Sequence, residues 1–393
     1  MRTRKGSMVD AFAIPPGATI QEYIEYTHCP LEDFANRLGL HRLSLNRLIR
    51  GEQALTTETA QKLELITGVG FSFWVNLEAN YRRALLREAS EAAAEDNAAW
   101  LANFPLNDLR RRGFLPADFA RLPPLEREQE VLRFFRRGSV QSLKEHLESA
   151  PYLLAARTTK GQESDLFSLV SWVQMGQVCA DRLLAGDRDF PAYDEQAFRK
   201  SIREAVLLSH NLNGPRYGVR DYLNEVVRLF RKAGVILICL EKIKGLNQVN
   251  GVARWMDNRP LIVLTLNGKQ ADRIIFSLLH ECSHVLNDGR RLVYVGRGAQ
   301  TPEEVRANKF AAECLIPASQ VKRLLAAGNL NALCEIASDL HVYTGVVVGQ
   351  FQHARNCWRD IGFRQKTIDW KSVGSWLIGD VPDVPARDVR SVR

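Results

Sequence analysis

The sequence lacks the features of a secreted or membrane protein. Its seven cysteines are scattered and include no C-x-x-C pair, which argues against a disulfide framework and for a reducing compartment. No apolar run approaches the roughly 18–20 residues that span a bilayer. The basic stretch MRTRKGSM at the start is followed by no hydrophobic segment, so no secretory signal is expected. These absences predict a cytoplasmic protein with no membrane partner.

The chain also lacks internal repeats, low-complexity segments and a strong charge of one sign. Its 53 basic and 45 acidic residues leave a net charge of +8, which over 393 residues does not by itself indicate nucleic-acid binding. A composition of 46% hydrophobic and 25% charged residues excludes a disordered or collagen-like chain. Because a single hydrophobic core rarely extends beyond about 250–300 residues, the length predicts more than one domain.

The pattern along the chain predicts four parts. Residues 1–90 contain short helical stretches separated by glycines, and residues 91–215 stay helical in pattern. In residues 216–345 a helix is followed by three short β-rich runs, VILICL, GVARWM and PLIVLTLN, and then by further helices. Residues 346–393 are expected to be a C-terminal helical segment and tail. The expected fold class is multi-domain, with an all-α head, a helical middle region and an α+β domain.

The strongest chemical motif is His280-Glu281-Cys282-Ser283-His284, an H-E-x-x-H inside an apolar helical stretch. Residues four apart lie on one face of a helix, so both imidazoles can point at one ion. Glu281 is rotated by roughly 100° from His280 and can reach a water molecule on that ion. Two histidine ligands, a water and a carboxylate base are the components of a zinc hydrolase site. The alternative is a helix whose histidines only satisfy core or surface hydrogen bonds.

A catalytic zinc site needs a third protein ligand, and three downstream glutamates are candidates: Glu303, Glu304 and Glu313. Thr301 can cap a helix that contains all three. Glu304 and Asn308 share one helix face, whereas Glu313 lies about half a turn away from Glu304. We therefore prefer Glu304 as the ligand and Asn308 as the residue that holds a ligating histidine. Alternatively, Glu304 only completes a capping box.

The segment around these residues resembles the ImmA/IrrE family of zinc metallopeptidases. The resemblance covers about residues 216–345 and is carried by H-E-C-S-H, by E-x-x-A-N-x-F-A some twenty residues later, by the following L-I-P, and by the hairpin GVARWM…RPLIVLTLN before the motif. It implies a zincin-like (gluzincin) fold with His280, His284 and Glu304 on zinc and Glu281 as general base. Members of the family are associated with the cleavage of a DNA-bound repressor. Cys282 stands where the family usually has a small or hydrophobic residue, and is either a small buried residue or a redox-sensitive thiol.

Two further elements of a peptidase site are expected from the same region. In a zincin, a strand such as PLIVLTLN lies along the cleft and can bind an extended peptide at the sheet edge. A donor to the developing oxyanion is also needed, and Tyr217, His341 and Tyr343 are candidates because of the segments in which they lie.

The amino-terminal part has the layout of a helix-turn-helix. Residues 31–38 supply the first helix, Gly39-Leu40 the turn, and residues 43–49 the recognition helix. Ala35 lets the two helices approach, and Leu38, Leu43 and Leu48 are expected in the core. The exposed face would present five polar residues that can bond to base edges or phosphates, namely Arg42, Ser44, Asn46, Arg47 and Arg50. The alternative is an ordinary helical bundle with a solvated basic helix.

The same segment resembles the XRE-type helix-turn-helix, and more closely its HigA-like antitoxin branch. The resemblance is carried by NRLIRGEQALTTETAQKLE and by FWVNLEANY. It implies that a homodimer binds an operator in DNA. Residues 1–90 contain 11 basic and 10 acidic side chains, so recognition would depend on a few placed arginines.

The combined hypothesis is a DNA-binding transcriptional regulator fused to a zinc-dependent endopeptidase that cleaves a repressor or antitoxin-like partner protein. The alternative is an antitoxin-like DNA-binding repressor whose zincin-like domain serves as a sensor or interaction surface without proteolysis. The middle region resembles the helical segment between such modules, and its sequence indicates no role.

Overall fold

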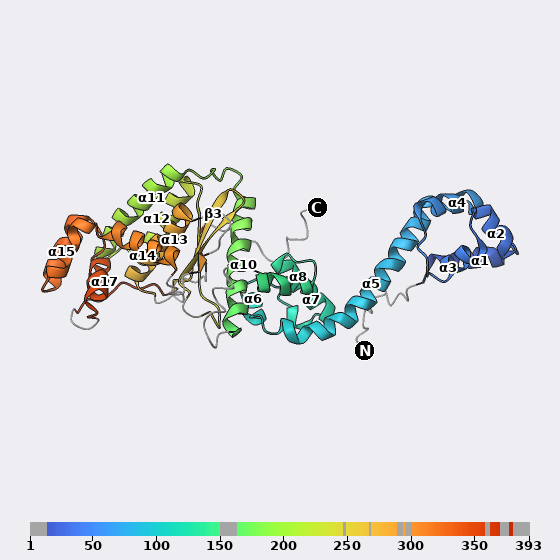
Figure 1. Ribbon diagram of the computed structural model, residues 1–393, viewed down its shortest axis with the longest axis horizontal. Helices are drawn as coiled ribbons and strands as arrows, with labels where there is room; N and C mark the ends of the chain where they lie inside the picture. The colour runs from blue at the N-terminus through green and yellow to red at the C-terminus, as the bar shows by residue number, and fades with distance from the viewer. Residues whose placement is uncertain are drawn as a thin grey trace, which may run out of the picture. The chain divides into compact units, whose positions relative to one another are not determined.

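The computed structural model divides the chain into two compact units, Met1–Ala99 and Trp100–Arg393 (Figure 1). The residues that it describes are 14–149, 163–246, 249–266, 269–288, 294–295, 301–357, 362–369 and 377–379. The basic amino-terminal stretch and most of the predicted tail lie outside the described residues.

The first unit consists of helices. They are α1 (Pro16–Tyr26), α2 (Leu31–Leu38), α3 (Arg42–Ile49), α4 (Thr57–Thr67) and α5 (Phe71–Leu101), whose last turn crosses the boundary between the units. Gly39 ends α2 in the left-handed conformation, at φ 67°, which glycine adopts without strain. The expected turn between the first two helices of the helix-turn-helix therefore lies where the sequence predicts it.

The prediction that Leu43 lies in the core of this unit is wrong. Leu43 is 66% exposed, whereas Leu45 and Leu48 are buried with Phe34 and Leu38. Residues three apart lie on the same helix face, so Leu45 and Leu48 pack together. Leu43 precedes Leu45 by two residues, which is about 200° around the helix and directs it away from the core.

The second unit surrounds a mixed five-stranded sheet with the order β4-β2-β3-β1-β5. Its strands are β1 (Ile236–Leu240), β2 (Gly251–Met256), β3 (Arg259–Leu264), β4 (Tyr294–Val295) and β5 (Leu377–Ile378). Strands β1 and β3 are parallel, and the other neighbours are antiparallel. The predicted β2–β3 hairpin is present.

The position of β3 corrects an expectation. This strand, which contains most of PLIVLTLN, is hydrogen-bonded to β2 on one side and to β1 on the other. Because both of its edges are paired, β3 has no free edge at which a peptide can add a strand.

Helices cover both faces of the sheet. Those before the sheet are α6 (Leu106–Arg111), α7 (Pro124–Phe135), α8 (Val140–Ser149), α10 (Glu163–Gly186), α11 (Glu195–Leu208) and α12 (Val219–Lys232). Those after β3 are α13 (Ala271–Asn287), α14 (Pro302–Leu315), α15 (Ala318–Ala326), α16 (Leu330–Leu340) and α17 (Thr344–Arg355). The described residues also include two short 3₁₀ turns, Phe119–Arg121 and Ser209–Asn213.

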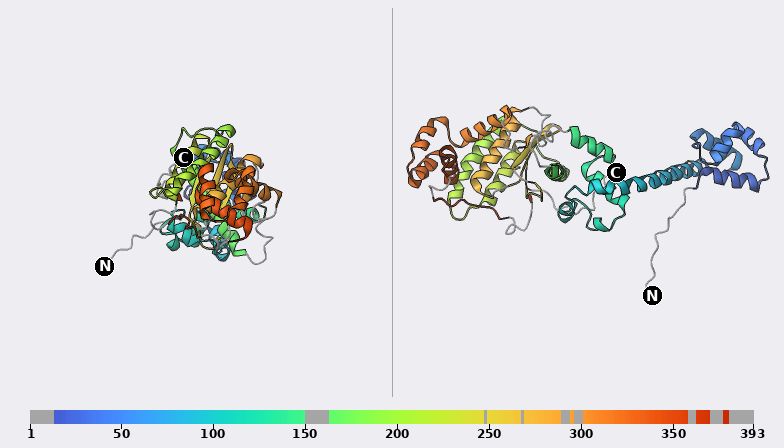
Figure 2. Two further views of the ribbon diagram at one scale, coloured as in Figure 1. Left: turned by 90° about the vertical axis from the view of Figure 1, so that its left-hand side faces the viewer. Right: turned by 60° about the horizontal axis from the view of Figure 1, so that its bottom comes forward.

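The two faces of the sheet belong to two cores. Leu237 and Ile262 pack in one core with residues of α11, α12 and α13, whereas Ile238 and Val263 pack in another with residues of α7 and α10. Figures 1 and 2 show the strands between α10 on one side and α11–α13 on the other. Strands that are apolar on both faces need cover on both sides. The part of the predicted middle region from Trp100 onward and residues 216–345 therefore lie in one compact unit.

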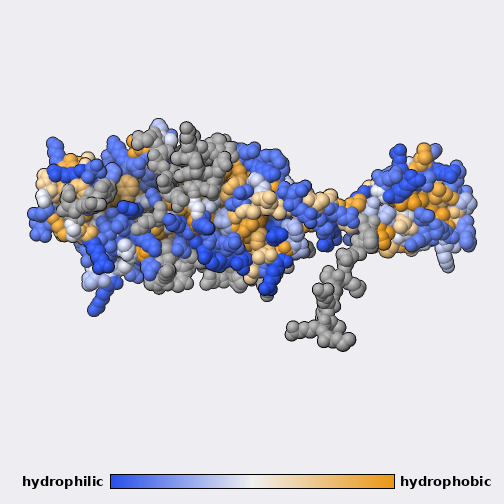
Figure 3. Space-filling model, turned by 90° about the horizontal axis from the view of Figure 1, so that it is seen from below, coloured by the Kyte–Doolittle hydropathy of each residue, from blue (hydrophilic) through white to orange (hydrophobic). Residues whose placement is uncertain are grey.

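The sequence predicts no disulfide framework and no membrane-spanning segment, and the structure bears on both expectations. All seven cysteines are free thiols. Among the described helices, none combines the length and the apolar character that a bilayer-spanning segment requires. On the face shown in Figure 3, hydrophilic residues are interspersed with smaller apolar areas on both units.

Candidate metal centre and DNA-binding helix

Helix α13 carries both histidines of the motif. Ile274, Ile275 and Leu278 are buried in the core on one side of the sheet, which fixes the rotation of the helix about its axis. With the helix held in this way, His280 and His284 lie one turn apart and both side chains are buried. Their Nε2 atoms are 3.1 Å from each other.

Helix α14 brings a carboxylate to the two imidazoles. Thr301 caps the helix by accepting a hydrogen bond from the backbone N–H of Glu304 at 3.3 Å. The Glu304 side chain is buried, with Oε2 3.1 Å from His280 Nε2 and Oε1 3.5 Å from His284 Nε2. Glu304 thus occupies the third position after the cap, where a capping-box glutamate would stand, and its side chain faces the two histidines.

The other two glutamates considered as ligands lie elsewhere. Glu303 is half-buried at the start of α14 and does not belong to the converging group, and the exposed Glu313 pairs with Lys309 at 3.8 Å. Among the described residues, the only group of three or more histidine, cysteine or acidic side chains whose ligand atoms converge is His280, His284 and Glu304. This buried group can bind a metal ion.

The spacing of the donor atoms fits zinc. A tetrahedral zinc ion with bonds of 2.0–2.1 Å separates its ligand atoms by about 3.3–3.4 Å. The two Nε2 atoms are 3.1 Å apart, and each lies 3.1–3.5 Å from one oxygen of the Glu304 carboxylate, Oε2 for His280 and Oε1 for His284. A zinc ion bound by these three side chains would keep a fourth position for water or substrate, as catalytic zinc sites require.

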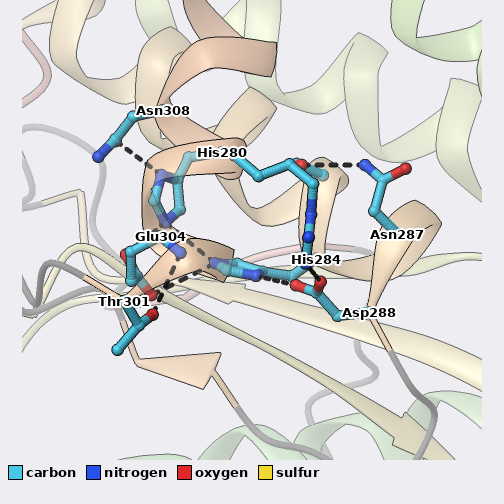
Figure 4. A network of polar contacts seen from close by, with 9 residues as sticks. His280, His284, Asn287, Asp288, Thr301, Glu304 and Asn308 are labelled. Carbon is cyan, nitrogen blue, oxygen red and sulfur yellow. Dashed lines mark hydrogen bonds and ion pairs between the residues drawn. The ribbon is translucent and has the colours of Figure 1, made fainter.

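Each histidine is oriented by a hydrogen bond from its Nδ1 atom, the ring nitrogen that points away from Glu304 (Figure 4). Nδ1 of His280 donates to Asn308 Oδ1 at 3.0 Å, and Nδ1 of His284 donates to Asp288 Oδ2 at 2.6 Å. Asp288 is buried and also pairs with Arg306. With both Nδ1 atoms donating, the two Nε2 lone pairs and the Glu304 carboxylate face one another. This arrangement requires a cation, either a proton or a metal ion, between them.

Asp288 is a functional candidate that the sequence reasoning missed. It follows His284 by four residues, directly after the end of α13. The signal was present as H-x-x-x-D at the end of the motif helix, because residues with that spacing lie on one face. Asn308, in contrast, lies beside His280 as the sequence predicts.

Glu281 is fully buried between α13 and β2. A Cβ atom at Gly251, the first residue of β2, would lie 2.7 Å from Glu281 Oε1, so only glycine leaves room for this carboxylate. Within the described part of the chain, Glu281 Oε2 has no hydrogen-bond partner. A buried carboxylate oxygen without a partner is costly, which indicates that its natural partner is a bound group.

The two carboxylates of the centre have opposite pKa shifts. Burial raises the pKa of Glu281 to about 8, against the opposing charge of His280. Burial would also raise the pKa of Glu304, but hydrogen bonds and charges from both histidines outweigh it and lower that pKa to about 2. Burial lowers the pKa of His280, and its contacts with the two glutamates outweigh this and raise it. Glu304 is therefore anionic at neutral pH, whereas Glu281 can carry a proton.

The three candidate oxyanion donors have other partners. The Tyr217 hydroxyl donates to Glu225 at 3.0 Å, and the Tyr343 hydroxyl accepts from the Lys366 backbone N–H at 2.8 Å. The exposed His341 ends α16 in the left-handed conformation. None of the three has a polar contact with the His280–Glu304 group among the described residues.

In the first unit, α3 presents most of its predicted polar face. Arg42, Arg47 and Arg50 are exposed, whereas Ser44 and Asn46 are half-buried. Arg42 lies 3.7 Å from Glu32 and Arg50 lies 3.9 Å from Glu52, and both pairs are open to solvent. Such exposed pairs are weak, so phosphates can displace them.

Comparison with known proteins identifies this segment. Residues 28–74 match the helix-turn-helix family model. Two proteins of Escherichia coli K12 named as uncharacterized HTH-type transcriptional regulators are similar to the chain: YddM is 35% identical over 63 residues, and YbaQ is 34% identical over 65 residues. Through this domain, the chain belongs to the helix-turn-helix family.

The extent of these matches limits what they cover. Each alignment spans 16% of this chain, and the chain covers 67% of YddM and 58% of YbaQ. The family match begins before α2 and ends within the first turn of α5, so it includes α3 and does not reach the metal-binding group. The helix-turn-helix domain and the buried His–His–Glu group therefore rest on independent observations.

Proposed function

We propose that the chain is a DNA-binding transcriptional regulator whose second unit is a zinc-dependent endopeptidase with a zincin-like (gluzincin) fold. The observation that carries the peptidase half is the buried triangle of His280 Nε2, His284 Nε2 and the Glu304 carboxylate, whose outer nitrogens are held by Asp288 and Asn308. The regulator half is supported by the helix-turn-helix domain and its relatives.

The chain's own residues have separate roles in the proposed hydrolysis. A zinc ion held by His280, His284 and Glu304 would supply a Lewis acid for a peptide carbonyl and an acidified water molecule. Asp288 and Asn308 keep Nδ1 of each histidine protonated, so that both Nε2 atoms remain ligands. The Glu281 carboxylate takes the proton of the attacking water and passes it to the leaving amine.

We propose operator DNA as the ligand of α3, bound by a homodimer, and a repressor or antitoxin-like protein as the substrate. A domain that binds DNA would raise the local concentration of the peptidase near a substrate on the same DNA. The exposed arginines of α3 support the DNA contact.

The test measures zinc first and cleavage second. We expect one zinc per chain by elemental mass spectrometry for the wild type and for Glu281→Gln, because Glu281 is not a ligand. Glu304→Gln should lose zinc, whereas Glu303→Gln, which changes the half-buried neighbouring carboxylate outside the His–His–Glu group, should retain both zinc and activity. Cleavage of repressor proteins encoded next to this chain should fall by about 10²–10⁴-fold in Glu281→Gln, since general acid–base catalysis contributes that much.

Two results would contradict the proposal. Purified wild type without stoichiometric zinc would remove the metal centre. Stoichiometric zinc without any cleavage, with wild type and Glu281→Gln behaving alike, would favour the alternative of an antitoxin-like DNA-binding repressor whose zincin-like unit serves as a sensor or interaction surface.

A further inference from the structure

A cavity of about 590 Å³ lies beside the proposed metal centre, between α13, α14 and α17. Asn308 belongs to both sites: its Oδ1 accepts from His280 Nδ1, and the residue also lines the cavity. Cavities of this size accommodate a large side chain or a small ligand. The cavity is therefore a binding space that adjoins a metal ligand.

The wall of the cavity is mostly apolar. Phe276 contributes from α13, Ala312 and Leu315 from α14, and Val346 from α17. An aromatic ring can pack against the Phe276 ring and the aliphatic wall, with a gain from both buried area and ring geometry.

One polar group in the lining lacks a partner. Asp272, in the first turn of α13, lines the cavity, and its buried Oδ1 accepts no hydrogen bond from any residue that the structure describes. A Cβ atom at Gly349 of α17 would lie 2.8 Å from Asp272 Oδ2, so α17 closes tightly over this carboxylate. A buried acceptor is costly until a donor reaches it, so an occupant with a hydrogen-bond donor is favoured.

The charges that line the cavity decide which kind of side chain can donate this hydrogen bond. Arg273 and His353 line the same cavity as Asp272, so the carboxylate does not make it an acidic pocket. A lysine or arginine side chain would be repelled by Arg273, whereas the hydroxyl of tyrosine or the indole N–H of tryptophan carries no charge. The lining thus favours a neutral aromatic side chain with a donor at its tip.

The distance from the metal centre places this side chain close to the scissile bond. Phe276 precedes His280 by four residues, which along a helix is about 6 Å. An extended peptide advances about 3.3 Å per residue, so a substrate residue adjacent to the cleaved bond reaches the cavity.

We propose that the cavity selects substrates by receiving a tyrosine or tryptophan side chain next to the scissile bond, with Asp272 as the acceptor for its O–H or N–H. The proposal rests on the proposed peptidase function. It names Ala312 and Asp272 as the residues whose replacement changes which peptides are cleaved.

The experiment uses the zinc-loaded full chain and a synthetic peptide library in which all residues occur on both sides of each bond, with cleavage sites read by mass spectrometry. We expect tyrosine and tryptophan to be enriched at one position beside the cleaved bond. Ala312→Trp fills the cavity and should lower the ratio of kcat/KM for a tyrosine peptide to that for its alanine counterpart by at least about tenfold. Ala326→Trp, at an exposed position of α15 outside the cavity, is the matched control and should leave the ratio unchanged.

A second variant tests the acceptor. Asp272→Asn replaces one carboxylate oxygen by an amide N–H, and should lower the preference for tyrosine over phenylalanine by about fivefold, the value of one hydrogen bond. Cleavage without preference for an aromatic residue, or a tyrosine-to-alanine ratio that Ala312→Trp leaves unchanged, would overturn the proposal.

A lack of peptidase activity can be distinguished from a lack of aromatic binding in the cavity. If no peptide is cleaved, binding of N-acetyl-tyrosinamide to the zinc-loaded Glu281→Gln chain is followed by NMR. Binding that Ala312→Trp abolishes and Ala326→Trp preserves would retain the cavity as an aromatic-binding site and remove the hydrolytic function. Absence of binding would overturn both.

Discussion

At the scale of single residues, the proposed metal centre depends on neighbours that are neither its proposed ligands nor its proposed base. Gly251 makes room for the Glu281 carboxylate, and Asp288 holds His284. An added Cβ at Gly251 would overlap the Glu281 carboxylate, and Asp288 lies within hydrogen-bond distance of His284. Small substitutions at either position should therefore have large local effects. Their roles can be separated because one borders the proposed base and the other borders a ligand.

Gly251→Ala should impair catalysis while zinc remains bound. The added Cβ would lie 2.7 Å from Glu281 Oε1 and 2.9 Å from Leu264 Cδ2, so Glu281 must shift or the sheet must move. Such overpacking costs about 1–3 kcal/mol. Gly138→Ala is the control, because a Cβ there has no atom within 4 Å. Zinc content, thermal unfolding and peptide cleavage are measured, and a Gly251→Ala chain identical to wild type in all three would contradict the close packing.

Asp288→Asn should weaken zinc binding by about 10–100-fold, the usual effect of losing a hydrogen-bond partner of a ligating histidine. The change keeps the shape of the side chain but removes the charge that favours a protonated Nδ1 on His284. Asp339→Asn is the matched control, since Asp339 also pairs with an arginine, Arg323, but lies exposed on α16. Zinc affinity is measured by competition with a chelator. Equal affinities for the two variants would exclude a role for Asp288 at the centre.

At the scale of elements, the rotation of a helix about its axis decides which residues it exposes. In α3, Leu45 and Leu48 determine the buried face, and this leaves Leu43 exposed with Arg42 and Arg47. Leucine spacing alone allowed two rotations for a helix of eight residues, and the packing against α1 and α2 selected one. The exposed arginines are those that the sequence assigned to DNA.

Arg47→Ala and Arg50→Ala should each weaken binding to DNA. Each lost phosphate contact makes the slope of log K against log salt less negative by about 0.9. Arg83→Ala, an exposed arginine of α5 in the same unit, is the control and should keep the slope. The DNA is a duplex selected by binding from random sequences, and affinity is measured at several salt concentrations. If the α3 variants and the control have the same slope, α3 does not contact DNA.

At the scale of the whole molecule, the chain has two units with separate cores, and the metal-binding group lies entirely in the second. A ligand that binds only the folded form stabilises the unit that binds it. Zinc should therefore act on the unfolding of Trp100–Arg393 and not on that of Met1–Ala99.

Removal of zinc by a chelator should lower the unfolding temperature of one calorimetric transition and leave the other in place. At a free zinc concentration one hundred times Kd, the stabilisation is about 2.7 kcal/mol. The variant His284→Ala lacks a ligand and should show no zinc-dependent shift, which serves as the control. Equal shifts of both transitions, or a shift that persists in His284→Ala, would contradict a zinc site confined to the second unit.

The sequence by itself determined what depends on local spacing. Residues four apart on α13 place His280 and His284 together, and the cap of α14 positions Glu304, because helix geometry is the same in any fold. The family resemblance of the helix-turn-helix segment likewise depends on a short stretch.

Only the tertiary structure decided which segments meet. It paired β3 on both edges, placed Gly251 against Glu281, and assembled a cavity between α13, α14 and α17. It also packed α7 and α10, from the predicted middle region, against one face of the sheet. These contacts depend on burial of apolar surface between distant elements, and that burial is non-directional, so no local pattern specifies which elements it brings together.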